Sequence, residues 1–188
     1  MSFFPAYFNL KDRKILLVGG GYIALEKLEK LVDFTKDIDV IAKEVSSDFE
    51  SFAHKQNIPI QKRAYRVGDI LPYDIVIVAT DTITLHETIY KESRTTRILV
   101  NSVDNIAYCD FIFPSYIKKG DLTIAISTSG ASPAMAKRLR IYIEKLIPNS
   151  IESFLKELKN LRKTMPKGKE RMKFFEKRSD DFMQKYFN

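Results

Sequence analysis

The feature that most constrains the fold is a regular alternation of short apolar runs with segments of helical spacing across the first hundred residues. Runs with the length and composition of buried strands lie at 14–18, 39–42, 58–65, 74–79 and 97–103. Apolar side chains at the spacing of one helix face occur between them, at 22–31, 46–57 and 82–93. Strands buried on both faces and separated by helices are typical of parallel sheets, so we predict an α/β fold with a Rossmann-like, doubly wound sheet.

The pattern changes after residue 104, where two strand-like runs follow one another without a helix between them. These runs, 110–117 and 122–128, are close enough to predict a hairpin or ribbon. Ser132-Pro133 predicts the N-cap and first residue of a helix that ends near Leu146. Helical spacing returns at 151–161 and 175–186. We predict three parts: a Rossmann-like unit at 1–109, a β-ribbon and helix at 110–148, and a small helical C-terminal domain at 149–188.

A glycine-rich turn lies between the first predicted strand and the first predicted helix. Gly19 and Gly21 stand in a Gly-x-Gly-x-x-Ala pattern that ends at Ala24. Gly19 permits the tight turn, Gly21 lets the backbone approach a pyrophosphate, and Ala24 allows the helix to pack closely on the strand. The backbone amides around Tyr22 and Ile23 then face the anion. The sequence predicts a dinucleotide site here, and a tight turn without a ligand is the alternative.

Two further strand ends supply candidate cofactor contacts. Lys43 and Glu44 follow the second predicted strand, where an acidic residue commonly binds the ribose hydroxyls. Glu44 favours NAD, whereas Lys43 would favour a 2′-phosphate, so both NAD and NADP remain open. Thr80 and Asp81 follow the fourth strand, at the edge where ligands bind in open α/β sheets. The same two side chains could instead cap the following helix.

Composition excludes several classes of protein. One cysteine, Cys109, excludes a disulfide framework and a four-cysteine zinc site, and only two histidines exclude a histidine-rich metal site. We expect Cys109 to be an inert core or interface thiol. No apolar run approaches the roughly 20 residues that span a bilayer. The first ten residues lack the basic and apolar regions of a signal peptide, so we expect a cytoplasmic protein without a membrane partner.

The net charge of +7 is concentrated near the C-terminus. Residues 1–136 carry 16 basic and 17 acidic side chains, whereas residues 137–188 carry 15 basic and 7 acidic ones. A solvated helical face, a nucleic acid and a small polyanion are the possible explanations of such an excess. No nucleic-acid recognition motif accompanies it, so we expect no nucleic-acid partner.

The sequence resembles the precorrin-2 dehydrogenase family, which is also the N-terminal module of siroheme synthases. Six stretches carry the resemblance in order and spacing: Phe4–Leu10, Lys14–Gly21, Val78–Asp81, Val100–Asp104, Asp110–Ser115 and Leu122–Pro133. The resemblance covers residues 3–147, and the remaining tail is similar only in being helical and basic. It implies NAD-dependent oxidation of precorrin-2 to sirohydrochlorin, and in many members insertion of Fe²⁺ to give sirohaem. It also implies an intertwined homodimer that exchanges residues 110–148, and we expect no methyltransferase half in this chain.

Within this resemblance, the key carboxylate of the family falls on Asp104, as general base and as a transient ligand of the incoming Fe²⁺. Asp104 also follows the fifth predicted strand, at the edge that faces the cofactor, where dehydrogenation needs a base. A turn or cap role is the alternative. A family serine corresponds to Thr128, beside Ser129, and either hydroxyl could bind a substrate carboxylate. The neighbouring Ser132 is expected to cap the following helix.

Precorrin-2 and sirohydrochlorin carry eight carboxylates, so basic side chains near the site would favour their capture. Lys137, Arg138 and Arg140 are the candidates, and a solvated surface is the alternative. Three hypotheses follow for the whole protein: a dehydrogenase that also inserts iron, a dehydrogenase that needs a separate chelatase, and a nucleotide-sensing dimer without chemistry. Asp104 and the hydroxyl-rich loop at 127–132 argue against the sensor, which needs neither.

Overall fold

A computed structural model describes residues 3–187, which form two compact units, Phe3–Ile112 and the chain from Phe113 onward. The first unit holds five strands: β1 (Ile15–Val18), β2 (Ile38–Ala42), β3 (Ile60–Lys62), β4 (Ile75–Val78) and β5 (Leu99–Ser102). Its helices are α1 (Tyr22–Leu31), α2 (Ser47–Lys55), α3 (Ile83–Ser93) and the 3₁₀ turn η1 (Ile106–Tyr108). Strands and helices alternate through the unit except between β3 and β4, where the sequence pattern predicted no helix either.

The five strands form one parallel sheet in the order β3-β2-β1-β4-β5. Both β1 and β4 are fully buried, and Leu16, Val76 and Val100 belong to one core cluster. The order of the strands reverses between β1 and β4, and open α/β sheets bind ligands at such a switch point. The topology confirms the predicted Rossmann-like fold.

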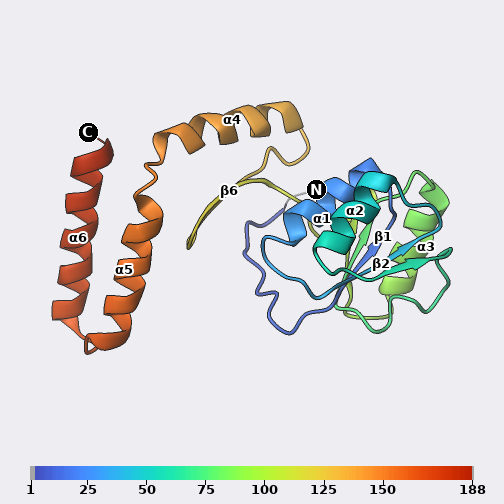
Figure 1. The fold of residues 1–188 in the computed structure, drawn as a ribbon, viewed down its shortest axis with the longest axis horizontal. Coiled ribbons are helices and arrows are strands. Elements are labelled where there is room, and N and C mark those ends of the chain that lie inside the picture. Colours follow the sequence, from blue (N-terminus) through green and yellow to red (C-terminus); the bar gives the residue numbers. More distant parts are fainter. Residues whose placement is uncertain (1–2, 188) are drawn as a thin grey trace. The chain divides into compact units, whose positions relative to one another are not determined.

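Helices cover both faces of this sheet (Figure 1), with α1 and α2 packed together on one face and α3 on the other. Each helix presents its apolar side chains to the sheet, as Leu28 of α1, Phe49 of α2 and Ile89 of α3 show by their complete burial. Ser46 is the N-cap of α2, because its hydroxyl accepts a hydrogen bond from the Phe49 amide at 3.3 Å. The helices do not cover the carboxyl ends of β1, β2, β4 and β5.

Two predicted strands are shorter than expected. Within the run 58–65, only the three residues of β3 pair with β2. β3 is the edge strand of the sheet and exposes Gln61 and Lys62 to solvent. The run 110–117 is extended only from Ser115. Asp110 instead anchors the chain to the end of β5, where its carboxylate accepts hydrogen bonds from the Val100 amide at 2.8 Å and from Arg94 at 2.6 and 2.8 Å.

The second unit contains a two-stranded antiparallel ribbon and three helices. They are β6 (Ser115–Lys119), β7 (Leu122–Ile126), α4 (Pro133–Leu146), α5 (Ile151–Thr164) and α6 (Lys169–Phe187). Ser132 caps α4 through the Met135 amide, as predicted. Phe154 of α5 stacks on Phe182 of α6, with ring centroids 4.2 Å apart. Among the described residues, no helix has the length and apolar character that a membrane span requires.

Candidate functional site

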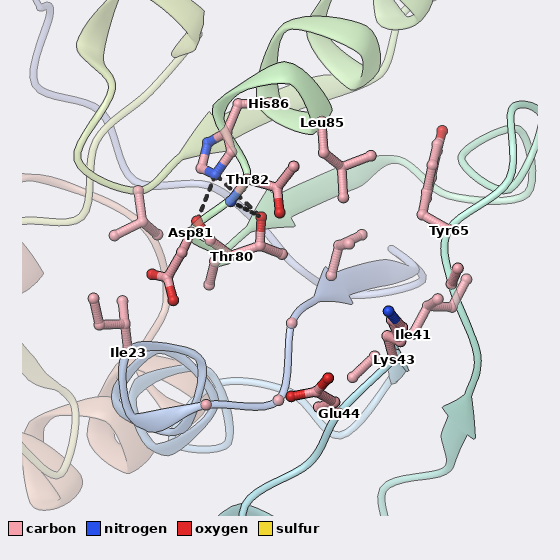
Figure 2. Close-up of a pocket in the computed structure, with 18 of the residues that line it drawn as sticks. Ile23, Ile41, Lys43, Glu44, Tyr65, Thr80, Asp81, Thr82, Leu85 and His86 are labelled. Carbon is pink, nitrogen blue, oxygen red and sulfur yellow. Dashed lines mark hydrogen bonds between the residues drawn. The ribbon is translucent and has the colours of Figure 1, made fainter.

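The main pocket of the first unit lies at the carboxyl ends of β1, β2, β4 and β5. Its volume is about 1450 Å³, larger than the range typical of small-molecule sites. Figure 2 shows its walls: the glycine turn and α1 below, Lys43 and Glu44 on one side, and Thr80 with His86 opposite. Eight predicted cofactor contacts line it: Gly19, Gly21, Tyr22, Ile23, Lys43, Glu44, Thr80 and Asp81. Asp104 lines the same pocket.

The three glycines of the turn have different surroundings. Gly19 has a φ of +129°, and a Cβ there would lie 2.1 Å from the Ala79 carbonyl oxygen. At Gly20 a Cβ would lie 2.6 Å from the carbonyl oxygen of Glu44. Gly21 differs, because a Cβ there would meet nothing within 4 Å. Gly19 and Gly20 therefore let the turn pack on its neighbours, whereas Gly21 keeps space free at the pocket surface.

This free space lies at the N-terminus of α1. Gly21 is the N-cap, and in the described chain no side chain caps the helix or places an acidic group in its first turn. The first N–H groups of a helix have no acceptor within it, and together they carry a partial positive charge. An anion such as a pyrophosphate satisfies both features. The glycine turn thus fits a dinucleotide, whose phosphates would be held by the amides of Tyr22 and Ile23.

The end of β2 carries charges of both signs. Lys43 and Glu44 are both exposed at the pocket, and neither has an ion pair among residues 3–187. A third charge, Arg63, is already engaged, because its guanidinium donates to both oxygens of Asp69 at 2.6 and 2.9 Å. These hydrogen bonds hold the pKa of Asp69 below its ordinary value. Lys43 and Glu44 are therefore the charged groups free to meet a ribose or its phosphate.

The opposite wall contains a residue that sequence reasoning missed, His86. This histidine of α3 is 3% exposed and hydrogen-bonds the Thr80 carbonyl oxygen at 2.8 Å. The Thr80 hydroxyl accepts from the Thr82 amide at 3.3 Å, just before the helix begins (Figure 2). Thr82 rather than Thr80 or Asp81 is the N-cap residue. A polar residue on the buried face of a predicted helix was the available signal.

Asp104 lies on a tight turn after β5. It is exposed at the pocket and has a φ of +60°, the left-handed region that Asp and Asn tolerate best among residues other than glycine. Below the turn, the buried Cys109 accepts a hydrogen bond from the Ser102 amide at 3.2 Å and approaches the Asn105 carbonyl oxygen at 3.4 Å. Burial raises the pKa of the Cys109 thiol, so it stays protonated at neutral pH. The burial of Cys109 confirms its predicted place in the core.

A cation of α1 contributes to the field around this turn. Burial lowers the pKa of Lys27, and the neighbouring Lys30 lowers it further. The negative charges of Glu26 and Asp104 act in the opposite direction. Lys27 therefore interacts electrostatically with Asp104. The sequence did not predict this interaction, because a lysine in a helical segment usually faces solvent.

The five predicted substrate contacts belong to the second unit. Thr128 and Ser129 lie in the loop before α4, where the Thr128 hydroxyl accepts from the Ser132 amide at 3.0 Å. Lys137 and Arg138 are exposed on α4, and neither has an ion pair among residues 3–187. Arg140 pairs with Glu144 at 2.6 Å. Lys137 and Arg138 thus retain free positive charges, whereas that of Arg140 is partly neutralised.

Comparison with known proteins gives the same picture from independent evidence. A family model described as "Putative NAD(P)-binding" matches residues 6–115, and a second, "Sirohaem biosynthesis protein central", matches residues 119–146. A solved structure described as "SirC, precorrin-2 dehydrogenase" superposes with a TM-score of 0.76 at 26% sequence identity. It covers 90% of this chain, and this chain covers 85% of it.

Curated relatives carry the name siroheme synthase. The protein of Nitrosococcus oceani is 33% identical over 150 residues, and that of Serratia proteamaculans is 34% identical over 151 residues. Each alignment covers 80% of this chain and 32% of the relative, so the chain spans about a third of the length of these relatives. The first family model spans more than half of the chain. The protein therefore belongs to this NAD(P)-binding family, and its residues 119–146 match the sirohaem-biosynthesis model, as the resemblance to precorrin-2 dehydrogenases and siroheme synthases predicted.

Proposed function

We propose that this protein oxidises precorrin-2 to sirohydrochlorin with NAD⁺. The observation that carries the proposal is the position of Asp104, whose exposed carboxylate lines the same pocket as the glycine turn. A protein that only senses nucleotides needs no exposed carboxylate at that place. The solved structure named precorrin-2 dehydrogenase and the relatives named siroheme synthase support the same reaction.

The residues divide the work of this reaction between binding and proton transfer. The amides at the start of α1 bind the pyrophosphate, and Glu44 binds the ribose hydroxyls, which selects NAD over NADP. When bound, NAD⁺ supplies the hydride acceptor. Oxidation of a carbon framework by hydride loss also releases a proton, and a carboxylate oxygen of Asp104 accepts it. Lys137 and Arg138 attract the carboxylates of the tetrapyrrole, and Thr128 and Ser129 donate hydrogen bonds to them.

The experiment is an anaerobic incubation of the protein with precorrin-2 and NAD⁺. We expect one NADH for each sirohydrochlorin formed, measured by the absorbance of both products. Protein heated to denaturation and protein without NAD⁺ are the controls. Binding of NADH without any oxidation of precorrin-2 would contradict the proposal and favour a nucleotide sensor.

Insertion of Fe²⁺ into sirohydrochlorin is a second candidate activity of the same pocket. The described residues contain no group of three or more metal-ligating side chains, so iron would be a substrate held in passing rather than a resident ion. The Asp104 carboxylate is a suitable transient ligand for Fe²⁺ and a base for the pyrrole N–H protons. Anaerobic addition of Fe²⁺ to sirohydrochlorin tests it, and a rate equal to the protein-free control would exclude it.

We also infer a homodimer in the cytoplasm. The β6–β7 ribbon has two open edges in the described chain, and such edges are ready to pair with a strand of another chain. Large apolar side chains of α4 are exposed beside it: Met135, Leu139, Tyr142 and Leu146. A second copy would cover both. Light scattering should give a mass of two chains.

The free thiol of Cys109 fits the proposed cytoplasmic location.

A further inference from the structure

Buried hydrogen bonds connect the two sides of the pocket mouth beneath its surface. His86 of α3 and Ser102 of β5 are 3% and 2% exposed, and the His86 Nδ1 lies 3.0 Å from the Ser102 hydroxyl. The other ring nitrogen, Nε2, lies 2.8 Å from the Thr80 carbonyl oxygen. One imidazole thus joins the chain at the end of β4 to the end of β5.

The partners determine which nitrogen of the neutral imidazole carries the hydrogen. A carbonyl oxygen can only accept, so Nε2 of His86 carries a hydrogen and donates it to Thr80. In the neutral ring Nδ1 then accepts, and the Ser102 hydroxyl donates to it. Each group has a defined role, and loss of the imidazole would leave two polar groups without their partner in a buried place, which is costly.

The connection continues from Ser102 to the turn that carries Asp104. The Ser102 amide donates to the thiol of Cys109 at 3.2 Å, and its carbonyl oxygen accepts from the Asn105 amide at 3.2 Å. The Cys109 thiol lies within hydrogen-bond distance of the carbonyl oxygens of Ser102 and Asn105, at 3.1 and 3.4 Å. These bonds enclose Asp104, whose left-handed backbone needs such support.

We propose that His86 is a positioning residue that holds the Asp104 turn in fixed relation to the Thr80 wall of the pocket, through Ser102 and Cys109. The chain of bonds runs from Thr80 to His86, Ser102, Cys109 and the turn. Its effect on catalysis rests on the proposed function, because it concerns the distance between the bound dinucleotide and the carboxylate. Its effect on the turn does not rest on that function.

Three variants separate the two branches of the imidazole. His86→Leu removes both hydrogen bonds, and His86→Asn keeps a polar atom near the position of Nδ1, toward Ser102. Ser93→Ala is the matched control, because Ser93 is also buried on α3 but bonds to the Tyr90 carbonyl oxygen and Arg94, away from the pocket. Melting temperatures of all three allow effects on the turn to be compared at similar stability.

Amide hydrogen exchange, measured by NMR without any tetrapyrrole, is the first readout. In His86→Leu we expect exchange at Asn105, Tyr108 and Cys109, whose amides are bonded within the turn, to accelerate at least tenfold. His86→Asn should restore most of the protection, and Ser93→Ala should leave these amides as in the natural protein. Equal protection of the turn in His86→Leu, or equal loss in Ser93→Ala, would overturn the proposal. If His86→Leu does not fold, Ser102→Ala removes the hydroxyl that bonds Nδ1 of His86 and keeps the backbone of β5. Faster exchange at these three amides in Ser102→Ala then supports the proposal, and exchange equal to that of the natural protein contradicts it.

Turnover provides the second readout. We expect the kcat of His86→Leu to fall at least tenfold while its dissociation constant for NADH stays within threefold of the natural value. A fall in cofactor affinity that accounts for the whole loss would overturn the assignment to the Asp104 turn. Failure of the proposed function is distinguishable, because it would abolish oxidation in the natural protein while the exchange result still reports on His86.

Discussion

Substitution of Gly19 and of Gly21 by alanine should have opposite consequences, although the two positions are only two residues apart. Gly19→Ala places a Cβ 2.1 Å from the Ala79 carbonyl oxygen at a φ of +129°. The backbone conformation alone costs about 1–3 kcal/mol for a residue with a side chain. Movement of β1 away from β4 to relieve the contact adds to this cost, so we expect a total of at least about 3 kcal/mol. That is a large fraction of the stability of an ordinary domain.

Gly21→Ala puts the methyl group into open space at an ordinary φ of −89°. Restricting the unfolded chain stabilises by about 0.4–1 kcal/mol, and alanine is a poorer N-cap than glycine by a similar amount. The two effects nearly cancel. The methyl group occupies the space where a pyrophosphate would approach the helix, and we expect the dissociation constant for NADH to rise at least tenfold, about 1.4 kcal/mol.

Thermal melting by circular dichroism and NADH fluorescence titration measure the two effects. At about 2–4 °C per kcal/mol, Gly19→Ala should melt at least about 6 °C lower and Gly21→Ala within about 4 °C of the natural protein. Unchanged NADH affinity in Gly21→Ala would refute the assignment of the open space to the cofactor. Unchanged melting of Gly19→Ala would refute the packing role of that glycine.

Three further predictions concern charge. Lys43→Glu should weaken NADP⁺ binding at least tenfold more than NAD⁺ binding, because it repels a 2′-phosphate; equal losses in calorimetric titrations would exclude that contact. Asp69→Asn should lower the stability at pH 7 by about 1–3 kcal/mol. The Arg63 hydrogen bonds depress the pKa of Asp69 in the folded state, so this stabilisation is complete above its ordinary pKa of about 4 and is lost as the pH falls through the lower folded value. Urea denaturation should therefore show the two proteins converging at acidic pH, and a constant difference would contradict this. Replacing Lys137 and Arg138 together by Glu should raise the KM for precorrin-2 at low salt. An unchanged KM would show that the two side chains belong to a solvated surface that does not bind the substrate.

Much of the first unit was predictable because local spacing encodes it. The apolar runs became β1, β2, β4 and β5, and the glycine turn stands where a strand-to-helix junction was expected. Strand length was less predictable. The chain at 58–65 has apolar residues, but as an edge strand it finds a partner only over Ile60–Lys62. Pairing depends on neighbours in space, which a single run of sequence does not specify.

The site followed the same division. Residues at strand ends converge on one pocket because parallel strands end at one edge of the sheet, and so Lys43, Thr80 and Asp104 were predictable. The buried connection through His86 and Ser102 was not predictable, since it joins two elements whose contact is set by packing.

The final helix begins earlier than its apolar residues indicate, because its first turn from Lys169 is polar and exposed.

The most direct test of the central claim is the turnover of Asp104→Asn. Asparagine tolerates the left-handed backbone of this position, so the variant should keep the fold. Its dissociation constant for NADH should stay within threefold of the natural value. Loss of a general base typically costs about 10²–10⁴-fold in rate, and we predict a fall in kcat for precorrin-2 oxidation within that range. Normal turnover by a folded Asp104→Asn that binds NADH would contradict the account.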